Sequence, residues 1–185
     1  MQTSRSYSPL QRTLHWLIAL GVIVMVPLGI YMVQRGAWSN FDALTNTLYS
    51  WHKLIGFCLL WVIVLRIIVR LARGAPPPEP IHPILQFGAT LSHFGLYVLL
   101  LLVPVLGWVG LSAYGAMDAA LGITLPSIVA KNDALSETVL QYHGWAALLL
   151  GLVALVHIGA ALMHRFIFKD GVFARMWPGA GPGGQ

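Results

Sequence analysis

Four long apolar stretches, separated by polar segments, dominate the pattern of hydrophobic and polar positions along the chain. They cover residues 16–33, 54–72, 94–113 and 144–163. About 20 helical residues span the hydrocarbon core of a bilayer. Lipid offers no partner for unpaired backbone groups, so each stretch is predicted to be a transmembrane helix. The predicted fold class is therefore all-α, an integral membrane four-helix bundle.

Three connectors are expected between these spans. Residues 34–50 form a short polar connector. The second connector, 73–90, contains the proline-rich run 76–80, which predicts an extended link at the surface. The third, 114–140, is the longest, and a short surface helix is expected within it at 134–138.

The domain organisation is predicted to be simple. One domain is expected over residues 1–178, followed by a disordered tail at 179–185 that is rich in glycine. Pro27 and Pro104 lie inside spans and are expected to kink their helices, which membrane bundles tolerate. The first apolar stretch is expected to be a retained span, since no cleavage site of small residues follows it.

The composition supports a membrane location and narrows the chemistry. Only 9% of the residues are charged and 57% are hydrophobic, whereas a soluble domain carries roughly 25% charge. The net charge of +5 lies at the ends of the apolar stretches, so a nucleic-acid partner is not expected. Cys58 is the single cysteine, and no C-x-x-C-H motif is present, which excludes covalent c-type haem attachment.

The basic residues predict the orientation, because they concentrate on the cytoplasmic side. One set of ends carries most of them: Arg5, Arg12, Arg66, Arg70, Arg73, Arg165, Lys169 and Arg175. The opposite set carries Arg35, Lys53 and Lys131, diluted by Asp42, Asp118, Asp133 and Glu137. Both termini and the proline-rich link are therefore expected on the cytoplasmic side.

Histidines are the residues with the most informative positions. The chain has seven: His15, His52, His82, His93, His143, His157 and His164. His82 lies among prolines and is expected to be solvated, while the other six lie within or at the edges of apolar stretches. A histidine can cap a helix or bond a neighbouring helix. However, burying six polar rings without partners costs several kcal/mol each, so ionisable residues inside a membrane indicate a functional site.

The depths of these histidines predict two ligand pairs. His52 and His143 both begin spans at the extracytoplasmic level. His157 follows His143 by fourteen residues, which is about 21 Å along a helix, and returns to within roughly 40° of the same face. One helix thus offers ligands at two depths, as two haems stacked across a bilayer require. His15 and His93 both begin spans at the cytoplasmic level, and periodicity leaves both open as the partner of His157.

Other metals fit this pattern less well than haem iron. Zinc and copper prefer ligands close together, often with cysteine, whereas these imidazoles lie at two levels about 20 Å apart. Arg66 lies fourteen residues after His52, near the cytoplasmic level, where haem propionates would provide a counter-ion. His164 lies about 10 Å beyond His157, at the headgroup boundary.

Several short motifs, in order along nearly the whole chain, resemble the bacterial cytochrome b561 family of four-helix di-haem proteins of the inner membrane. They are Tyr7-Ser8, Leu14-His15-Trp16, His52 with Gly56, Arg66 with Arg70, Ser92-His93-Phe94-Gly95, His143 with His157, and the stretch from His164 through Phe168-Lys169-Asp170 to Arg175-Met176-Trp177-Pro178. The resemblance implies that His15 pairs with His157 on one haem b and His52 with His143 on the other.

The same resemblance implies a reaction and its partners. Family members exchange electrons with ubiquinone, and the branch with this architecture includes enzymes that oxidise superoxide at the periplasmic face. His93, His164 and Arg66 then become the expected lining of a quinone pocket at the cytoplasmic end. Lys53, directly beside His52, is by its own charge a candidate catalytic residue that attracts an anionic donor to the neighbouring haem, and the alternative is a lysine that only marks the membrane interface.

Two other functions remain open from the sequence. The chain is also compatible with a membrane-anchored cytochrome b subunit that passes electrons between quinone and a dehydrogenase or hydrogenase partner. A haem-free bundle that acts as a transporter or scaffold is the third possibility, and it predicts a colourless protein.

Overall fold

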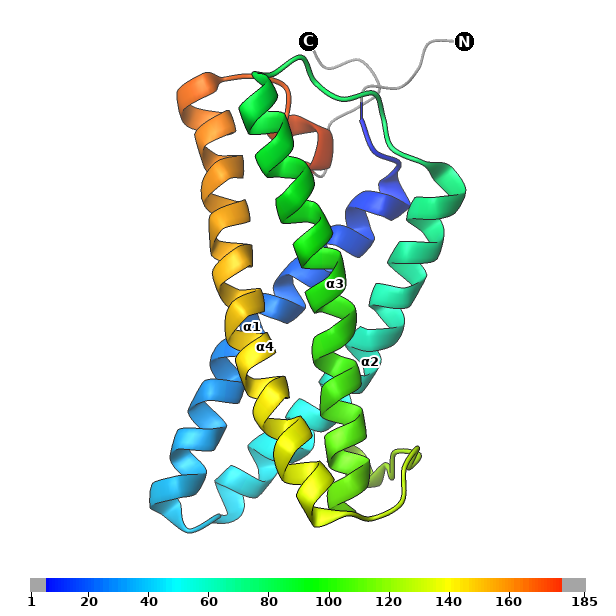
Figure 1. Ribbon diagram of the computed structural model, residues 1–185, viewed down its shortest axis with the longest axis vertical. Coiled ribbons are helices and arrows are strands. Elements are labelled where there is room, and N and C mark those ends of the chain that lie inside the picture. Colours follow the sequence, from blue (N-terminus) through cyan, green and yellow to red (C-terminus); the bar gives the residue numbers. More distant parts are fainter. Residues whose placement is uncertain (1–5, 178–185) are drawn as a thin grey trace.

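Four long helices make up most of residues 6–177, which are the residues that the computed structural model describes (Figure 1). They are α1 (Pro9–Ser39), α2 (Ala43–Arg73), α3 (Pro83–Tyr114) and α4 (Asp133–Met163). Three short helical turns accompany them: η1 (Ala120–Gly122), η2 (His164–Phe168) and η3 (Phe173–Met176). Extended pairing within this range is limited to one isolated bridge, Asp118 with Thr124. The predicted all-α class is confirmed. The predicted tail at 179–185 lies outside the described residues.

Side-chain caps start the first two helices well before their apolar stretches. Ser8 and Gln11 form a capping box in which the Ser8 hydroxyl accepts from the Gln11 backbone N–H, and Pro9 occupies the first turn of α1. Asp42 caps α2 by accepting from the Thr45 backbone N–H at 2.8 Å. The connector expected at 34–50 is therefore reduced to a turn at residues 40–42.

The other two helices also begin earlier than expected. An extended link at 74–82 joins α2 to α3, which confirms the proline-rich connector, and exposed His82 caps α3. The separate surface helix expected at 134–138 is wrong, because the side chain of Asn132 caps α4 and these residues form its first turns. The last turn of α4 widens into the π-type turn η2.

The helices pack as a bundle with two distinct ends (Figure 1). Helix α3 packs along α4, α1 along α2, and α2 against α3, while α1 and α4 contact each other less. The start of α1, the link at 74–82 and η3 lie together at one end, called here the link end. The turn at 40–42 and the connection at 115–132 lie at the other, called the hairpin end.

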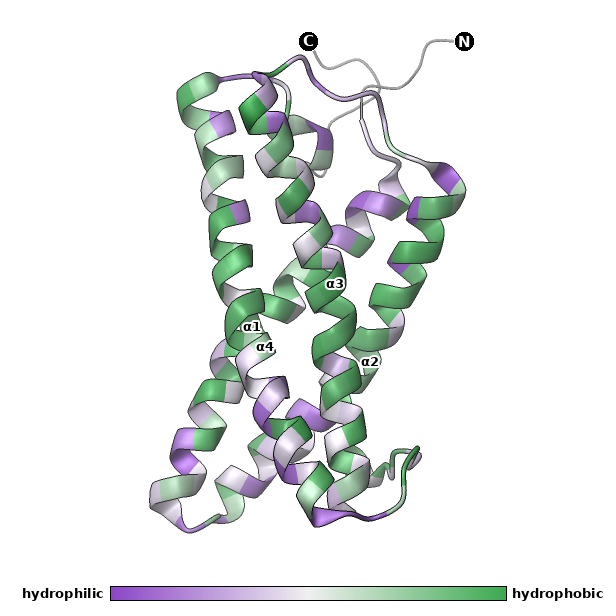
Figure 2. Cartoon of the chain, viewed as in Figure 1, coloured by the Kyte–Doolittle hydropathy of each residue, from purple (hydrophilic) through white to green (hydrophobic). Residues whose placement is uncertain are grey.

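The surface of the bundle is apolar over most of its length. Figure 2 shows hydrophobic residues along the middle of the helices and polar residues gathered towards the two ends. Each of the four helices is long and apolar enough to cross a membrane. In the most apolar 18-residue segment of each helix, at most 22% of the residues are buried inside the protein. Apolar side chains with this exposure require a lipid environment. The bundle therefore spans the membrane.

Candidate functional site

Two histidines from different helices face each other near the hairpin end. His52 on α2 and His143 on α4 have ring centroids 6.2 Å apart, with ring planes at 89°. Nδ1 of His143 lies 2.8 Å from the backbone oxygen of Val103. A carbonyl oxygen only accepts, so Nδ1 carries the proton and Nε2 remains available to bind a metal. Nδ1 of His52 is buried without a hydrogen-bond partner in the described part of the chain.

Glycines on the neighbouring helices make room for these two rings. A β-carbon at Gly107 of α3 would lie 3.1 Å from Cε1 and Nδ1 of His143. A β-carbon at Gly29 of α1 would lie 3.3 Å from Cε1 of His52. Both distances are shorter than ordinary van der Waals contact, so the absence of a side chain at these positions lets the imidazoles lie against the helix backbones.

A second histidine pair lies towards the link end. His15 on α1 and His157 on α4 have ring centroids 6.3 Å apart, with planes at 78°. His93 on α3 also contacts His157, at the shorter centroid distance of 5.3 Å. The structure thus brings together all three histidines expected at this level. The centroid distance between His15 and His157 matches the distance within the pair at the hairpin end. The distance between His93 and His157 is shorter and does not match it.

The two matched separations would let each pair of imidazoles hold one iron between them. Two metal–nitrogen bonds of about 2 Å, added to the distance from each nitrogen to its ring centre, put the centroids roughly 6 Å apart. Two imidazoles complete an iron only when a macrocycle supplies four further nitrogens, as haem does. Within residues 6–177, no three histidine, cysteine or acidic side chains gather as a site for a bare ion. The residues present fit haem.

Arg66 adds positive charge beside the histidines of the link end. Its guanidinium is half-buried and donates to the backbone oxygen of Gln11 at 2.9 Å. It also interacts electrostatically with His15, His93 and His157. This location agrees with the depth expected from the sequence. The hydrogen bond from Arg66 to Gln11 was not predicted, because nothing in the sequence marks a backbone carbonyl as a partner.

His164 lies apart from that cluster, in the turn that ends α4. It is buried, and its Nδ1 lies 2.5 Å from a carboxylate oxygen of Asp170. Its ring also meets the ring of Phe168, with the centroids 5.3 Å apart. The structure therefore does not bring His164 into contact with His93 or Arg66, with which it was expected to line one pocket. Asp170 was missed as its partner, although an acidic residue six positions later on a turn is a usable signal.

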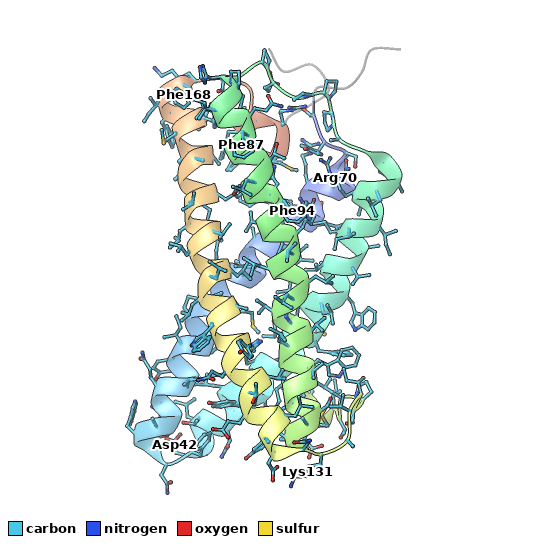
Figure 3. All side chains as sticks on the ribbon, in the orientation of Figure 1. Asp42, Arg70, Phe87, Phe94, Lys131 and Phe168 are labelled. Atoms are coloured by element: carbon cyan, nitrogen blue, oxygen red, sulfur yellow. The ribbon has the colours of Figure 1, made fainter. Side chains whose placement is uncertain are left out.

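Lys53 follows His52 on α2 and points to the connection between α3 and α4. Its ammonium donates to the backbone oxygen of Ala116 at 3.1 Å, and the Asp118 carboxylate is near enough to interact with it electrostatically. Figure 3 shows the polar groups of this end, with Asp42 and Lys131 labelled, far from Arg70 and Phe168 at the link end. Lys53 thus has a defined position at the hairpin end of the bundle.

Comparison with known proteins identifies the family. The model of prokaryotic cytochrome b561 matches residues 6–179, nearly the whole chain. The chain belongs to the prokaryotic cytochrome b561 family. It is 30% identical to the "Probable superoxide oxidase CybB" of Yersinia pestis over 183 residues, which cover 94% of this chain and 97% of that protein. It is also 30% identical to "Cytochrome b561 homolog 2" of Escherichia coli K12, over 94% of this chain and 92% of the relative. Its identity to "Cytochrome b561 homolog 1" of the same organism is 31%, with 93% and 97% covered.

Membership of the cytochrome b561 family establishes the general activity. The chain is a multi-pass protein of a prokaryotic inner membrane, it carries electrons within that membrane, and haem b is the cofactor of its family. The haem-free transporter or scaffold considered from the sequence is thereby set aside.

Proposed function

We propose that this cytochrome b561 takes electrons from superoxide at its hairpin end and delivers them to ubiquinone at its link end, and that two haems b, when bound, would supply the one-electron chemistry between the two ends. Two superoxide ions each lose one electron and become two molecules of oxygen. Ubiquinone takes up the two electrons and two protons from the cytoplasmic side and becomes ubiquinol. The observation that supports this proposal is the pair of matched histidine couples at two depths, which share α4.

The proposed ligands are His52 with His143 at the hairpin end and His15 with His157 at the link end. When bound, each haem supplies reversible one-electron chemistry, which no side chain of this bundle provides. The hydrogen bond from His143 to the carbonyl of Val103 holds that ring in one orientation and raises the basicity of its Nε2. Gly107 and Gly29 keep the ligand rings close to the helices.

The donor end is assigned from charge and from a relative. The Yersinia relative carries the name of a superoxide oxidase. Lys53 provides a positive charge next to His52 at the hairpin end, and a cation there raises the rate at which a small anion arrives. Its hydrogen bond to Ala116 keeps the ammonium at this position.

The proposed acceptor end comprises His93 and Arg66, with His164 as a separate proton donor at the end of α4, where it contacts Asp170 and Phe168. The ring of His93 contacts His157, and Arg66 is near enough to interact electrostatically with the histidine pair of the link end, where a quinone would receive electrons. The Asp170 carboxylate accepts from Nδ1 of His164, which leaves Nε2 of that ring to exchange a proton with a quinone oxygen. The protons and the electrons then arrive from separate groups at the same end of the bundle.

The first experiment counts haems in purified protein. Wild type is expected to hold two per chain, and His15→Ala, His52→Ala, His143→Ala and His157→Ala are each expected to hold one. His93→Ala and the exposed control His82→Ala are expected to keep both. A loss of haem from His93→Ala, with two retained in His15→Ala, would exchange their assignments. Fewer than two haems in the wild type after full reconstitution would refute the proposal.

The second experiment tests the donor by stopped-flow mixing with superoxide. Haem reduction is expected faster than spontaneous dismutation, with a second-order rate that falls as salt rises. Lys53→Met is expected to be several-fold slower and less sensitive to salt, while Lys53→Arg keeps both properties. If wild type is not reduced above background, superoxide is not the donor, and a copurifying dehydrogenase or hydrogenase becomes the donor to look for.

A further inference from the structure

The C-terminal segment of the described chain contacts the residue beside His15. Trp16 follows His15 on α1, and the two rings meet edge-on at 5.5 Å. The indole N–H of Trp16 donates to the backbone oxygen of Met176 at 2.8 Å. The same indole meets the ring of Trp177 at 5.7 Å, with planes at 90°. One tryptophan therefore connects a proposed haem ligand to a segment about 160 residues later in the chain.

This segment is itself held by several further contacts. Arg12, one turn before Trp16, donates to the backbone oxygen of Trp177 at 3.0 Å. The backbone N–H of Tyr7 donates to the oxygen of Arg175 at 3.3 Å. The Arg175 side chain pairs with Glu79 at 3.8 Å and donates to the backbone oxygen of Pro77. Residues 175–177 are thus fixed both to the start of α1 and to the link between α2 and α3.

The corresponding position at the hairpin end lacks such a connection. At the hairpin end, Trp51 is the tryptophan directly beside a proposed ligand, His52. Within residues 6–177, the side chain of Trp51 makes no hydrogen bond and no aromatic ring contact. At that end, the hydrogen bond between His143 and Val103 orients one ring of the pair instead. A segment distant in the sequence therefore restrains a proposed ligand at the link end, and no such segment does so at the hairpin end among the described residues.

We propose that residues 175–177 position the His15 imidazole, acting through Trp16, so that this ring would stay bound to the iron of a haem held at the link end. A ring held on one side by a hydrogen-bonded indole loses freedom to turn, and a ligand already in place costs less to order when it binds. Trp16 and residues 175–177 are positioning residues, because none of them contacts the iron. This inference rests on the proposed function for the assignment of His15.

The test compares Trp16→Phe with Trp51→Phe in the haem-loaded protein. Phenylalanine keeps an aromatic ring beside His15 but cannot donate to Met176. In Trp16→Phe, the midpoint potential of the link-end haem is expected to shift. The reduced link-end haem should also bind carbon monoxide in a fraction of the molecules, because carbon monoxide needs a position that an imidazole has left. The hairpin-end haem should bind none. Trp51→Phe is expected to match wild type in both measurements.

Two truncations and a haem-independent readout complete the experiment. A chain that ends at Val172 is expected to behave as Trp16→Phe does, and a chain that ends at Trp177 as wild type does. Hydrogen–deuterium exchange of the first two turns of α1 is expected to accelerate in the first truncation and in Trp16→Phe.

The outcomes separate this inference from the function on which it rests. The positioning role is overturned if the link-end haem keeps its wild-type potential and carbon monoxide binding in Trp16→Phe. The same holds for the chain that ends at Val172. An equal change at both haems overturns it as well. If wild type itself holds no haem at His15 and His157, the proposed function fails first.

Discussion

Two glycines determine how closely single imidazoles approach the neighbouring helices. Gly107 and Gly29 lie against His143 and His52, and a methyl group at either position would sit 3.1 Å or 3.3 Å from a ring atom. Because an α-helix prefers alanine to glycine by about 1 kcal/mol, glycine at these places is best explained by the space that each ring needs.

Gly107→Ala should therefore weaken the hairpin-end site alone. The new methyl group displaces the His143 ring and disturbs its hydrogen bond to Val103, so occupancy of the haem at that end should fall below wild type while the other stays full. Gly88→Ala on the same helix is the matched control, since a β-carbon there meets no atom within 4 Å. Reduced-minus-oxidised spectra with haem quantification measure both. Equal occupancy in the two variants would contradict the role of Gly107.

The sequence predicted the histidine pairs better than the residues that support them. Fourteen-residue spacing put His143 and His157 on one face, and depth joined His143 to His52, as the structure has them. Periodicity left His15 and His93 open, and both prove to touch His157. Gln11 and Met176 were missed because they act through backbone carbonyls, and such contacts depend on which chain segments meet in space.

At the scale of the elements, side-chain caps determine at which residue a helix begins. The apolar stretches of 18 to 20 residues correspond to helices of 31 or 32 residues. Hydropathy reports which part of a helix lies in lipid, whereas polar side chains such as those of Asp42 and Asn132 determine where the helix starts. The number of helices was therefore predictable from apolar patterning, and their bounds were not.

The cap of α2 predicts a pH dependence of stability. Hydrogen bonds from the Thr45 backbone N–H and hydroxyl, with a smaller contribution from Arg35, lower the pKa of Asp42 from 3.8 to about 2. A carboxyl with a lowered pKa stabilises the folded state above the unfolded value and loses that contribution as pH falls towards 2. Asp42→Asn keeps an acceptor for the cap but cannot titrate.

Unfolding midpoints in detergent between pH 2 and pH 6 test this dependence. The midpoint of Asp42→Asn should fall less steeply below pH 4 than that of wild type, and the two should converge near pH 2. Curves that stay parallel over the whole range would exclude a contribution from Asp42.

For the whole molecule, the distribution of basic residues predicts which end faces the cytoplasm. The link end gathers most of the arginines and both described chain ends, whereas the hairpin end mixes Arg35, Lys53 and Lys131 with acidic residues. Basic residues remain on the cytoplasmic side during insertion. A reporter fused after residue 185 should therefore be active as a cytoplasmic fluorescent protein and inactive as a periplasmic phosphatase. The reverse pattern would place the donor and acceptor ends on the opposite sides.

Helix α4 contributes one imidazole to each couple, and this constrains its length more than its composition. Each added residue would turn everything beyond it by about 100° and advance it by 1.5 Å. A single insertion between His143 and His157 would swing one ring off its stripe while leaving the hydrophobicity of the span unchanged. A residue added to the extended segment at 74–82 changes no helical register, and its effect is confined to contacts such as those of Pro77 and Glu79 with Arg175. Natural variation in length should accordingly collect in that segment and be absent from the fourteen-residue interval on α4.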